Sequence, residues 1–267
     1  MYIDFHTHIF PEKIAAATVA HLGELCEIAP STDGTASGLR QSMDRAGIAL
    51  SVVLPVVTKP SQFASINRFA AAVNAENDRL ISFGGIHPDN DAIEDKLDEI
   101  VSLGLKGIKL HPDYQGVFID DERYLRILQG AVDRNLLISI HAGIDKGLPD
   151  TVHCPPARTR KALDALTLPS EPRIILAHGG GWGCWDEVET YLVGQPVYFD
   201  LGVTVEYIEE AQLLRLIRSH SAERILFATD APWSDQANIV RRFEALPLTD
   251  AERHAIAYGN AAALLGY

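Results

Sequence analysis

The chain has 267 residues, of which 47% are hydrophobic and 22% are charged, and its mean hydropathy is near zero. These values are typical of a globular domain, and the length suits one α/β barrel that spans residues 1–267 as a single domain. No apolar run is long enough to cross a bilayer, which argues against a membrane protein. The net charge of −13 and the lack of a basic stripe argue against a nucleic-acid partner. We expect a small-molecule substrate instead.

The three cysteines, Cys26, Cys154 and Cys184, are far apart and form no C-x-x-C pair. This spacing argues against a disulfide framework and against a structural zinc knuckle, and it is typical of a reducing compartment. The first residues, 2–6, have the pattern of a strand and lack that of a secretory signal. We therefore expect a cytoplasmic protein. The sequence is also compatible with a homo-oligomer.

Short apolar runs alternate with helical patterns along the chain. The runs are rich in Ile, Val, Leu or Phe and are bounded by Gly, Pro or polar residues, which predicts strands. Strands that alternate with helices form parallel sheets, and eight such units close a barrel. A doubly wound sheet would normally carry a G-x-G-x-x-G motif after its first strand, and this motif is absent. The eight predicted strands of the (β/α)₈ barrel are residues 2–6, 50–54, 81–86, 107–110, 136–141, 173–178, 197–201 and 224–229.

Two helices and two long connections stand out between these strands. Apolar spacing of three and four residues predicts helices over 93–101 and 125–132, the first ended by Gly104 and the second capped by Asp120 or Asp121. Residues 9–47 carry about two further helical patterns, and we expect this insertion after the first strand to act as a lid. Residues 143–156 form a polar connection after the fifth strand. Such loops at the carboxyl end of a barrel usually contact substrate.

Polar side chains follow four of the predicted strands at the point where each strand ends. His6 and His8 alternate along the first strand, so we expect both, together with Asp4, to face the barrel lumen. Two imidazoles on one side of a strand can bind one ion at about 2.0–2.1 Å. The carboxyl ends of barrel strands meet at the edge where barrel enzymes keep their active sites, which should bring His141, His178 and Asp230 to the same place.

Each of these residues also has an ordinary structural interpretation. A single histidine such as His141 is often a hydrogen-bonded core residue, and Asp230 could cap a helix that begins near Pro232. Burying His6 beside His8 without a metal, however, would cost desolvation free energy. Independent caps and core histidines would not all align at one edge of a barrel, so together the residues predict a metal centre.

Several motifs carry a resemblance to the amidohydrolase superfamily. They are Ile-Asp-Phe-His-Thr-His at 3–8, Ile-Lys-Leu-His-Pro at 108–112, His-Ala-Gly at 141–143, Leu-Ala-His-Gly-Gly at 176–180 and Phe-Ala-Thr-Asp at 227–230. The chain most resembles the amidohydrolase-related branch, which includes metal-dependent hydrolases and the aminocarboxymuconate-semialdehyde decarboxylase group. The resemblance covers the whole chain. It implies one divalent metal, usually zinc, with manganese or iron as alternatives, bound by His6, His8, His141 and Asp230, with His178 as a catalytic histidine or a ligand of a second metal.

The role of Lys109 is open. In binuclear members of the superfamily a lysine of the fourth strand is carboxylated and bridges two metals, and Lys109 matches that place. The branch that the chain most resembles does not depend on this lysine, so we expect one metal, with Lys109 and His111 near the substrate. His153 and Trp182 follow later strands and are further candidates for substrate contact. For Trp182 the alternative is packing against the next helix, and for Lys109 it is an ion pair in the lumen.

The predicted metal centre is compatible with three functions. The first is hydrolysis of an amide, ester or lactone by a metal-activated water, with Asp230 moving protons and His178 stabilising charge on the attacked carbonyl. The second is non-oxidative decarboxylation of a small unsaturated or aromatic acid by the same ligands. The third is ligand binding with a purely structural metal, but structural zinc sites are usually closed cages of Cys and His. We take metal-dependent hydrolysis as the main expectation and decarboxylation as the alternative.

Overall fold

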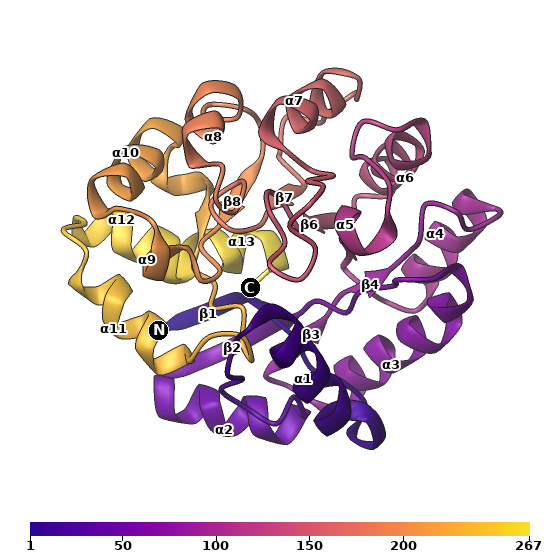
Figure 1. The fold of residues 1–267 in the computed structure, drawn as a ribbon, viewed down its shortest axis with the longest axis horizontal. Helices are drawn as coiled ribbons and strands as arrows, with labels where there is room; N and C mark the ends of the chain where they lie inside the picture. Colours follow the sequence, from indigo (N-terminus) through magenta and orange to yellow (C-terminus); the bar gives the residue numbers. More distant parts are fainter.

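The computed structural model describes residues 1–267 as a closed ring of parallel strands surrounded by helices (Figure 1). The nine short strands correspond to the eight predicted runs, because the third predicted strand is divided into two. The fold is the α/β barrel that the alternation of strands and helices predicts. The strands are β1 Tyr2–Thr7, β2 Ile48–Val53, β3 Leu80–Ser82, β4 Gly84–Gly85, β5 Gly107–Leu110, β6 Leu137–Ile140, β7 Ile174–Leu176, β8 Tyr198–Asp200 and β9 Ile225–Leu226.

Backbone hydrogen bonds close the ring where the two sets of paired strands meet. The first set has the order β1-β2-β3 and the second runs from β4 to β9 in chain order. The amide of Phe5 donates to the carbonyl of Phe227 at 2.9 Å, which joins β1 to the end of β9. The amide of Phe83 donates to Val53 at 2.9 Å, and at this residue the third predicted strand exchanges its partner from β2 to β5.

The predicted helices are present. The helix expected over 93–101 is α4, and the one expected over 125–132 is α6, where the side chain of Asp121 accepts from the backbone amide of Arg123. The insertion after β1 contains α1 and α2. The α-helices are α1 Glu12–Cys26, α2 Ala36–Ala46, α3 Phe63–Glu76, α4 Ile93–Ser102, α5 Pro112–Gln115, α6 Glu122–Asp133, α7 Pro156–Asp164, α8 Trp185–Tyr191, α9 Thr204–Tyr207, α10 Glu210–His220, α11 Gln236–Ala245, α12 Asp250–His254 and α13 Asn260–Leu265.

The buried apolar side chains form two clusters. The larger fills the space between the ring of strands and the surrounding helices, and it includes Ile108, Ile138 and Phe227. The smaller consists mostly of the alternate residues of the same strands, which point into the lumen, and helix α13 packs against it. Because this apolar packing occupies the lumen, polar side chains can gather only at its carboxyl-terminal end.

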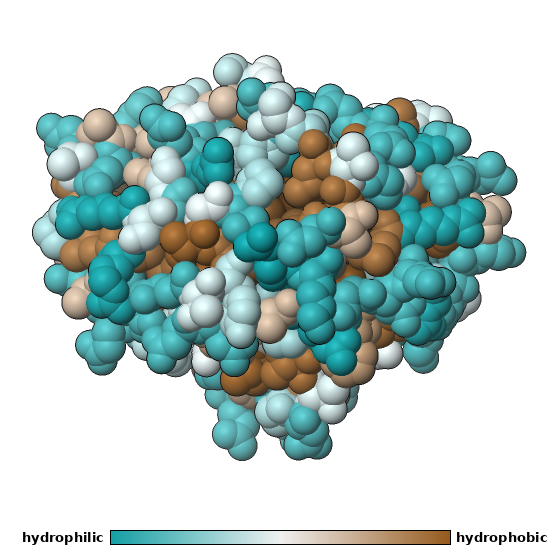
Figure 2. Space-filling view, turned by 90° about the horizontal axis from the view of Figure 1, so that it is seen from above, coloured by the Kyte–Doolittle hydropathy of each residue, from teal (hydrophilic) through white to brown (hydrophobic).

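Most of the face shown in Figure 2 is hydrophilic, and hydrophobic side chains show between the polar ones in separate patches. No helix combines the length and the apolar character that a bilayer crossing requires.

Candidate metal centre

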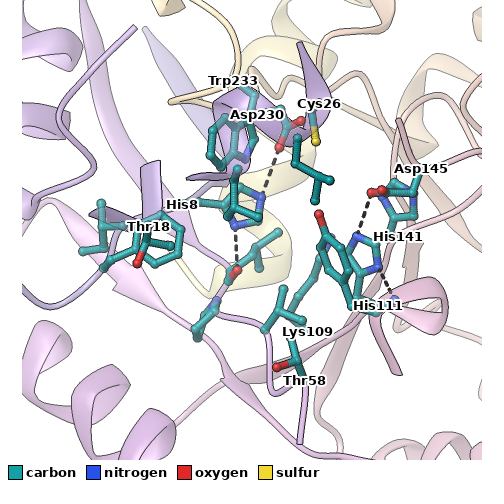
Figure 3. Close-up of a pocket in the computed structure, with 18 of the residues that line it drawn as sticks. His8, Thr18, Cys26, Thr58, Lys109, His111, His141, Asp145, Asp230 and Trp233 are labelled. Atoms are coloured by element: carbon teal, nitrogen blue, oxygen red, sulfur yellow. Dashed lines mark hydrogen bonds and ion pairs between the residues drawn. The ribbon is translucent and has the colours of Figure 1, made fainter. Parts of the chain in front are cut away.

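Three predicted ligands come together at the carboxyl-terminal end of the barrel. The Nε2 atoms of His6 and His8 are 3.2 Å apart, and Oδ1 of Asp230 lies 3.3 Å from the first and 3.1 Å from the second. His6 comes from β1, His8 follows β1, and Asp230 follows β9, so strands at the two ends of the chain supply the set. Figure 3 shows His8 and Asp230 joined across the cavity wall.

The partners of the other ring nitrogens fix the tautomers of both imidazoles. Nδ1 of His6 lies 3.0 Å from Oδ2 of Asp200, and Nδ1 of His8 lies 2.8 Å from the carbonyl oxygen of Leu54. Both partners are acceptors, so we assign the ring protons to the two Nδ1 atoms. The two Nε2 atoms are then bare lone pairs, and they face each other and the carboxylate of Asp230.

This convergence of three acceptors fits a divalent metal. Donors at about 2.0–2.1 Å from a tetrahedral ion lie roughly 3.3 Å apart, which matches the three observed separations. Without a metal ion, these three acceptors would face one another with only the ammonium group of Lys109, 3.3 Å from Nε2 of His6, to offset them. The nitrogen and oxygen donors present, with no thiolate, suit zinc, manganese or iron.

His141 lies beside this set and is oriented differently. Its Nδ1 is 3.1 Å from Nε2 of His178, whose own Nδ1 donates to the carbonyl of Gly202 at 3.0 Å. Nε2 of His141 is buried and has no hydrogen-bond partner, and the nearest carboxylate oxygens, of Asp113 and Asp145, are 4.0 Å away. The imidazole pair His141–His178 therefore forms a second group of donors next to His6, His8 and Asp230. The binding of one metal by His6, His8, His141 and Asp230 together stays a prediction.

A further cluster of possible ligands lies on the same side of the cavity. The rings of His111 and His141 stack with centroids 4.1 Å apart, and Nε2 of His111 is 3.5 Å from Oδ2 of Asp145. Burial is the main cause that lowers the pKa of both rings well below the usual value. His111 lines the cavity (Figure 3), and its ring is neutral; its contact with substrate stays a prediction.

Lys109 supplies a buried cation beside the predicted metal ligands. Its Nζ lies 3.3 Å from Nε2 of His6 and 3.5 Å from the hydroxyl of Ser139, and the side chain is 1% exposed. Burial lowers its pKa to about 8, and the nearby carboxylates of Asp200 and Asp230 oppose this shift. The ammonium form is therefore the main form at neutral pH. Lys109 therefore lies close enough to the predicted metal ligands to contact a molecule that binds beside them.

Two site residues have strained backbones. Asp230 has φ of 65° and His178 has φ of 60°, a region that costs a residue with a Cβ about 1–3 kcal/mol. Hydrogen bonds hold both in place, since the amide of Asp230 donates to the carbonyl of His6 at 2.8 Å and that of His178 to Asp200 at 3.1 Å.

The donors lie at the floor of a cavity of about 1050 Å³. Trp182 is among its walls and packs edge-on against Tyr207, with centroids 4.7 Å apart. Gly143, opposite, has φ of 84°, and a Cβ there would come within 2.1 Å of the Trp182 backbone, so only glycine permits this approach. His153 is not among the cavity walls, because its backbone and ring both bond to Asp113, at 2.9 and 3.1 Å.

Contrary to the expectation from sequence, Asp4 does not share the lumen side with His6 and His8, and instead makes ordinary hydrogen bonds in the protein core. Ile3 and Phe5 belong to the lumen cluster, and Asp4 points to the other side, where it accepts from Thr229 and from Gln236 of α11. The pairing of β1 with β2 shifts register between Asp4 and Thr7, and this irregularity aims His6 at the lumen.

Asp200, which was not among the residues predicted from the sequence, orients the ring of His6. Asp200 ends β8 at the same edge as the other ligands. A strand-end carboxylate was thus the signal that could have identified it. Asp145 and Asp113 were also missed, because Asp145 lies in a loop and Asp113 in the short helix α5, and neither ends a predicted strand. The capping role considered for Asp230 is excluded, because α11 begins at Gln236 and is capped by Asp235.

A comparison of the sequence with known families gives one match across the chain. A family model described as Amidohydrolase matches residues 3–267. The chain belongs to the amidohydrolase family. This confirms the resemblance found in the motifs and makes the protein a metal-dependent enzyme by family. No curated protein matches the sequence.

Solved structures with the same fold are only distantly related in sequence. An uncharacterised TIM-barrel protein of Bordetella bronchiseptica is 19% identical, with 99% of this chain and 98% of that chain covered and a TM-score of 0.78. A 5-carboxyvanillate decarboxylase of Novosphingobium aromaticivorans, complexed with manganese and 4-hydroxy-3-methoxy-5-nitrobenzoic acid, is 16% identical (100% and 96% covered, TM-score 0.72). A 2-pyrone-4,6-dicarboxylic acid hydrolase assigned in Pseudomonas putida is 17% identical (99% and 97% covered, TM-score 0.68).

Proposed function

We propose that the protein is a metal-dependent lyase that removes carbon dioxide from an unsaturated or aromatic carboxylic acid without oxidation. The observation that carries this proposal is the buried ammonium group of Lys109, 3.3 Å from the His6 donor atom. Immediately around the His6 donor atom, a divalent ion and Lys109 would together place more positive charge than Asp230 and Asp200 neutralise, whereas Asp145 lies farther along the cavity beside His111 and His141. A carboxylate substrate would compensate this charge, which a neutral amide or ester would not.

The residues would divide the reaction between them. His6, His8 and Asp230 would hold the metal, with His141 as the fourth ligand that the sequence predicts. The bound metal supplies a Lewis acid that polarises the substrate oxygens. In the reaction the bond between the ring or alkene carbon and the carboxylate breaks, carbon dioxide leaves, and the electron pair stays on carbon. That carbon then takes one proton, so that RCOO⁻ and H⁺ become RH and CO₂.

Lys109 and Asp230 would be the groups that act on charge and protons. The ammonium of Lys109 would orient the departing carboxylate by a charge-assisted hydrogen bond. Asp230 would carry the proton from solvent to the carbon atom. His178, which contacts His141 and also lines the cavity, would lie beside the reacting group. His111 and Trp182, both cavity walls, would bound the substrate ring. His153 would act only indirectly, through Asp113.

Several solved structures of this fold support the choice of reaction. Besides the manganese enzyme above, they include 2,6-dihydroxybenzoate decarboxylase and a further 5-carboxyvanillate decarboxylase. At 14–17% sequence identity, the similarity to these enzymes shows a shared fold. We accordingly propose one divalent ion per chain, with manganese as the first candidate and zinc, the sequence-based expectation, as the second.

Hydrolysis, the main expectation from sequence, is the second candidate. It is favoured by the two adjacent donor groups, His6–His8–Asp230 and His141–His178, which resemble a site built to activate a water molecule. The similar fold of a hydrolase assigned for a pyrone dicarboxylic acid also supports it. In this case Asp230 would accept the proton of the attacking water.

A direct experiment separates the two candidates. The manganese-loaded and zinc-loaded proteins are incubated with a panel of 2-hydroxybenzoic acids and, separately, with lactones, esters and amides. We expect carbon dioxide release from the acids that depends on the metal and is abolished by chelation. Hydrolysis of the second panel without carbon dioxide release from the first would refute the proposed lyase.

A further inference from the structure

The cavity extends well beyond the metal ligands. At about 1050 Å³ it is at or above the upper end of the range for pockets that hold drug-sized ligands, about 300–1,000 Å³. It reaches from His6 and Lys109 at the floor to helices α1 and α3. A single-ring acid bound at the floor would leave most of this volume empty.

The far part of the cavity has apolar walls on two sides. Helix α1 presents Ile14, Leu22 and Leu25 to it, and helix α3 presents Ile66 and Phe69. The α1 residues, with Thr18, are spaced by four, four and three positions, which places them on one face of the helix. We call this part of the cavity, bounded by these five apolar residues, the outer chamber.

Helix α1 therefore has two different faces. Ala15, Val19 and Gly23 are its only buried residues and pack against the body of the protein. On the face toward the outer chamber, Ile14 is 51% exposed and Leu25 is 44% exposed. Large apolar side chains left open on the wall of a cavity indicate a ligand that covers them.

We propose that the outer chamber binds an apolar extension of the substrate, an alkyl chain or a second ring of several carbons, whose reacting carboxylate lies at the metal ligands. The proposal rests on the proposed function for the identity of the reacting group. The continuity of the chamber with the metal ligands within one cavity favours the substrate as its occupant over a second copy of the chain. The insertion after β1, which supplies α1, would then determine chain-length specificity.

Binding of a homologous series tests the chamber separately from the chemistry. The probes are 2-hydroxybenzoates that carry a 4-alkyl group from none to octyl, and dissociation constants are measured by calorimetry on metal-free and manganese-loaded protein. We expect affinity to rise about fourfold for each added CH₂ in both forms, which corresponds to about 0.8 kcal/mol per buried CH₂. The metal should strengthen binding of all members by a common factor.

Two tryptophan variants on α1 provide a matched pair. Ala17 lines the cavity and is exposed, whereas Ala20 is exposed on the same helix outside the cavity. We expect Ala17→Trp to abolish the gain with chain length and Ala20→Trp to retain it. Leu22→Asn, a smaller change in the same wall, should weaken binding of the octyl member several-fold, so that the test does not depend on one variant folding.

The outcomes are distinguishable. If affinity does not change with chain length in the wild-type protein, or if both tryptophan variants behave alike, the outer-chamber proposal is wrong, whatever the reaction. The same holds if sedimentation shows that only Ala17→Trp dissociates an oligomer and no chain-length effect exists, because a second copy would then cover α1. If the chain-length effect is present but no acid releases carbon dioxide, the chamber stands and the proposed lyase fails.

Discussion

One carboxylate oxygen of Asp200 accepts from the ring of His6, and the other accepts from two backbone amides that follow the neighbouring strands. Oδ2 lies 3.0 Å from Nδ1 of His6, and Oδ1 accepts from the amides of His178 and Gly202 at 3.1 and 3.0 Å. All of these groups are buried. One carboxylate thus aims Nε2 of His6 at the metal position and connects it to the strand end that carries His178.

Asp200→Asn should weaken metal binding roughly 10- to 100-fold, the usual effect of removing the carboxylate behind a metal-ligating histidine. The amide has a single acceptor oxygen, which cannot accept from Nδ1 of His6 and also from the backbone amides of His178 and Gly202, so the ring would lose its alignment. Competition titration with a chelating dye measures the affinity. The exposed Asp133→Asn on α6 is the control. Wild-type affinity in Asp200→Asn would show that His6 needs no such support.

Asp230→Asn should retain most of the metal but lower kcat at least 100-fold, the scale of general acid–base catalysis. The two imidazoles still bind, and the amide oxygen still coordinates, but the side chain no longer carries a proton. Metal content by mass spectrometry and kcat are measured on the same sample. Turnover at the wild-type rate with full metal content would exclude the proton-transfer role.

Lys109→Met should leave one metal per chain and raise KM for the carboxylate substrate roughly 10- to 100-fold, because a hydrogen bond to a charged group is worth about 1.5–3 kcal/mol. Lys106→Met, on an exposed lysine whose Nζ bonds to the carbonyl of Leu265, is the control. Two metal equivalents in the wild-type protein that fall on removal of Lys109 would instead identify a carboxylated, metal-bridging lysine and overturn the single-metal assignment.

The buried ring of His220 should make the fold less stable in acid. Burial lowers its pKa to about 4, and the neutral ring accepts from Gly194 and donates to Val197. A histidine with a lowered pKa stabilises the fold above its unfolded pKa of about 6.5, and this contribution is lost as the pH falls from 6.5 toward 4. Denaturant unfolding of wild type and His220→Phe at pH 7 and pH 5 measures the effect.

For His220 we expect the loss of unfolding free energy between pH 7 and pH 5 to be about 2 kcal/mol smaller in the variant, since 1.5 pKa units separate 6.5 from 5. The variant should be less stable than wild type at pH 7, because its two hydrogen bonds are gone. An equal loss in both proteins would mean that other groups cause the acid sensitivity.

Much of the fold could be predicted because its determinants are local in the sequence. Runs of β-branched residues and apolar residues spaced by three or four positions are patterns that span only a few residues. The strands and helices α4 and α6 could therefore be predicted close to their observed ends. The division of the third strand at Phe83 was not predictable, because it arises where that strand exchanges one neighbour for another across the barrel.

The candidate site divides in the same way. The sequence by itself determined which residues stand at strand ends, and hence that His6, His8 and Asp230 would meet. Only the tertiary structure decided where each ring points. The register shift in β1, the support of His6 by Asp200 and the turn of His141 toward His178 depend on contacts between segments 37 to 194 positions apart. Orientation follows from packing against distant neighbours, and no local pattern carries that information.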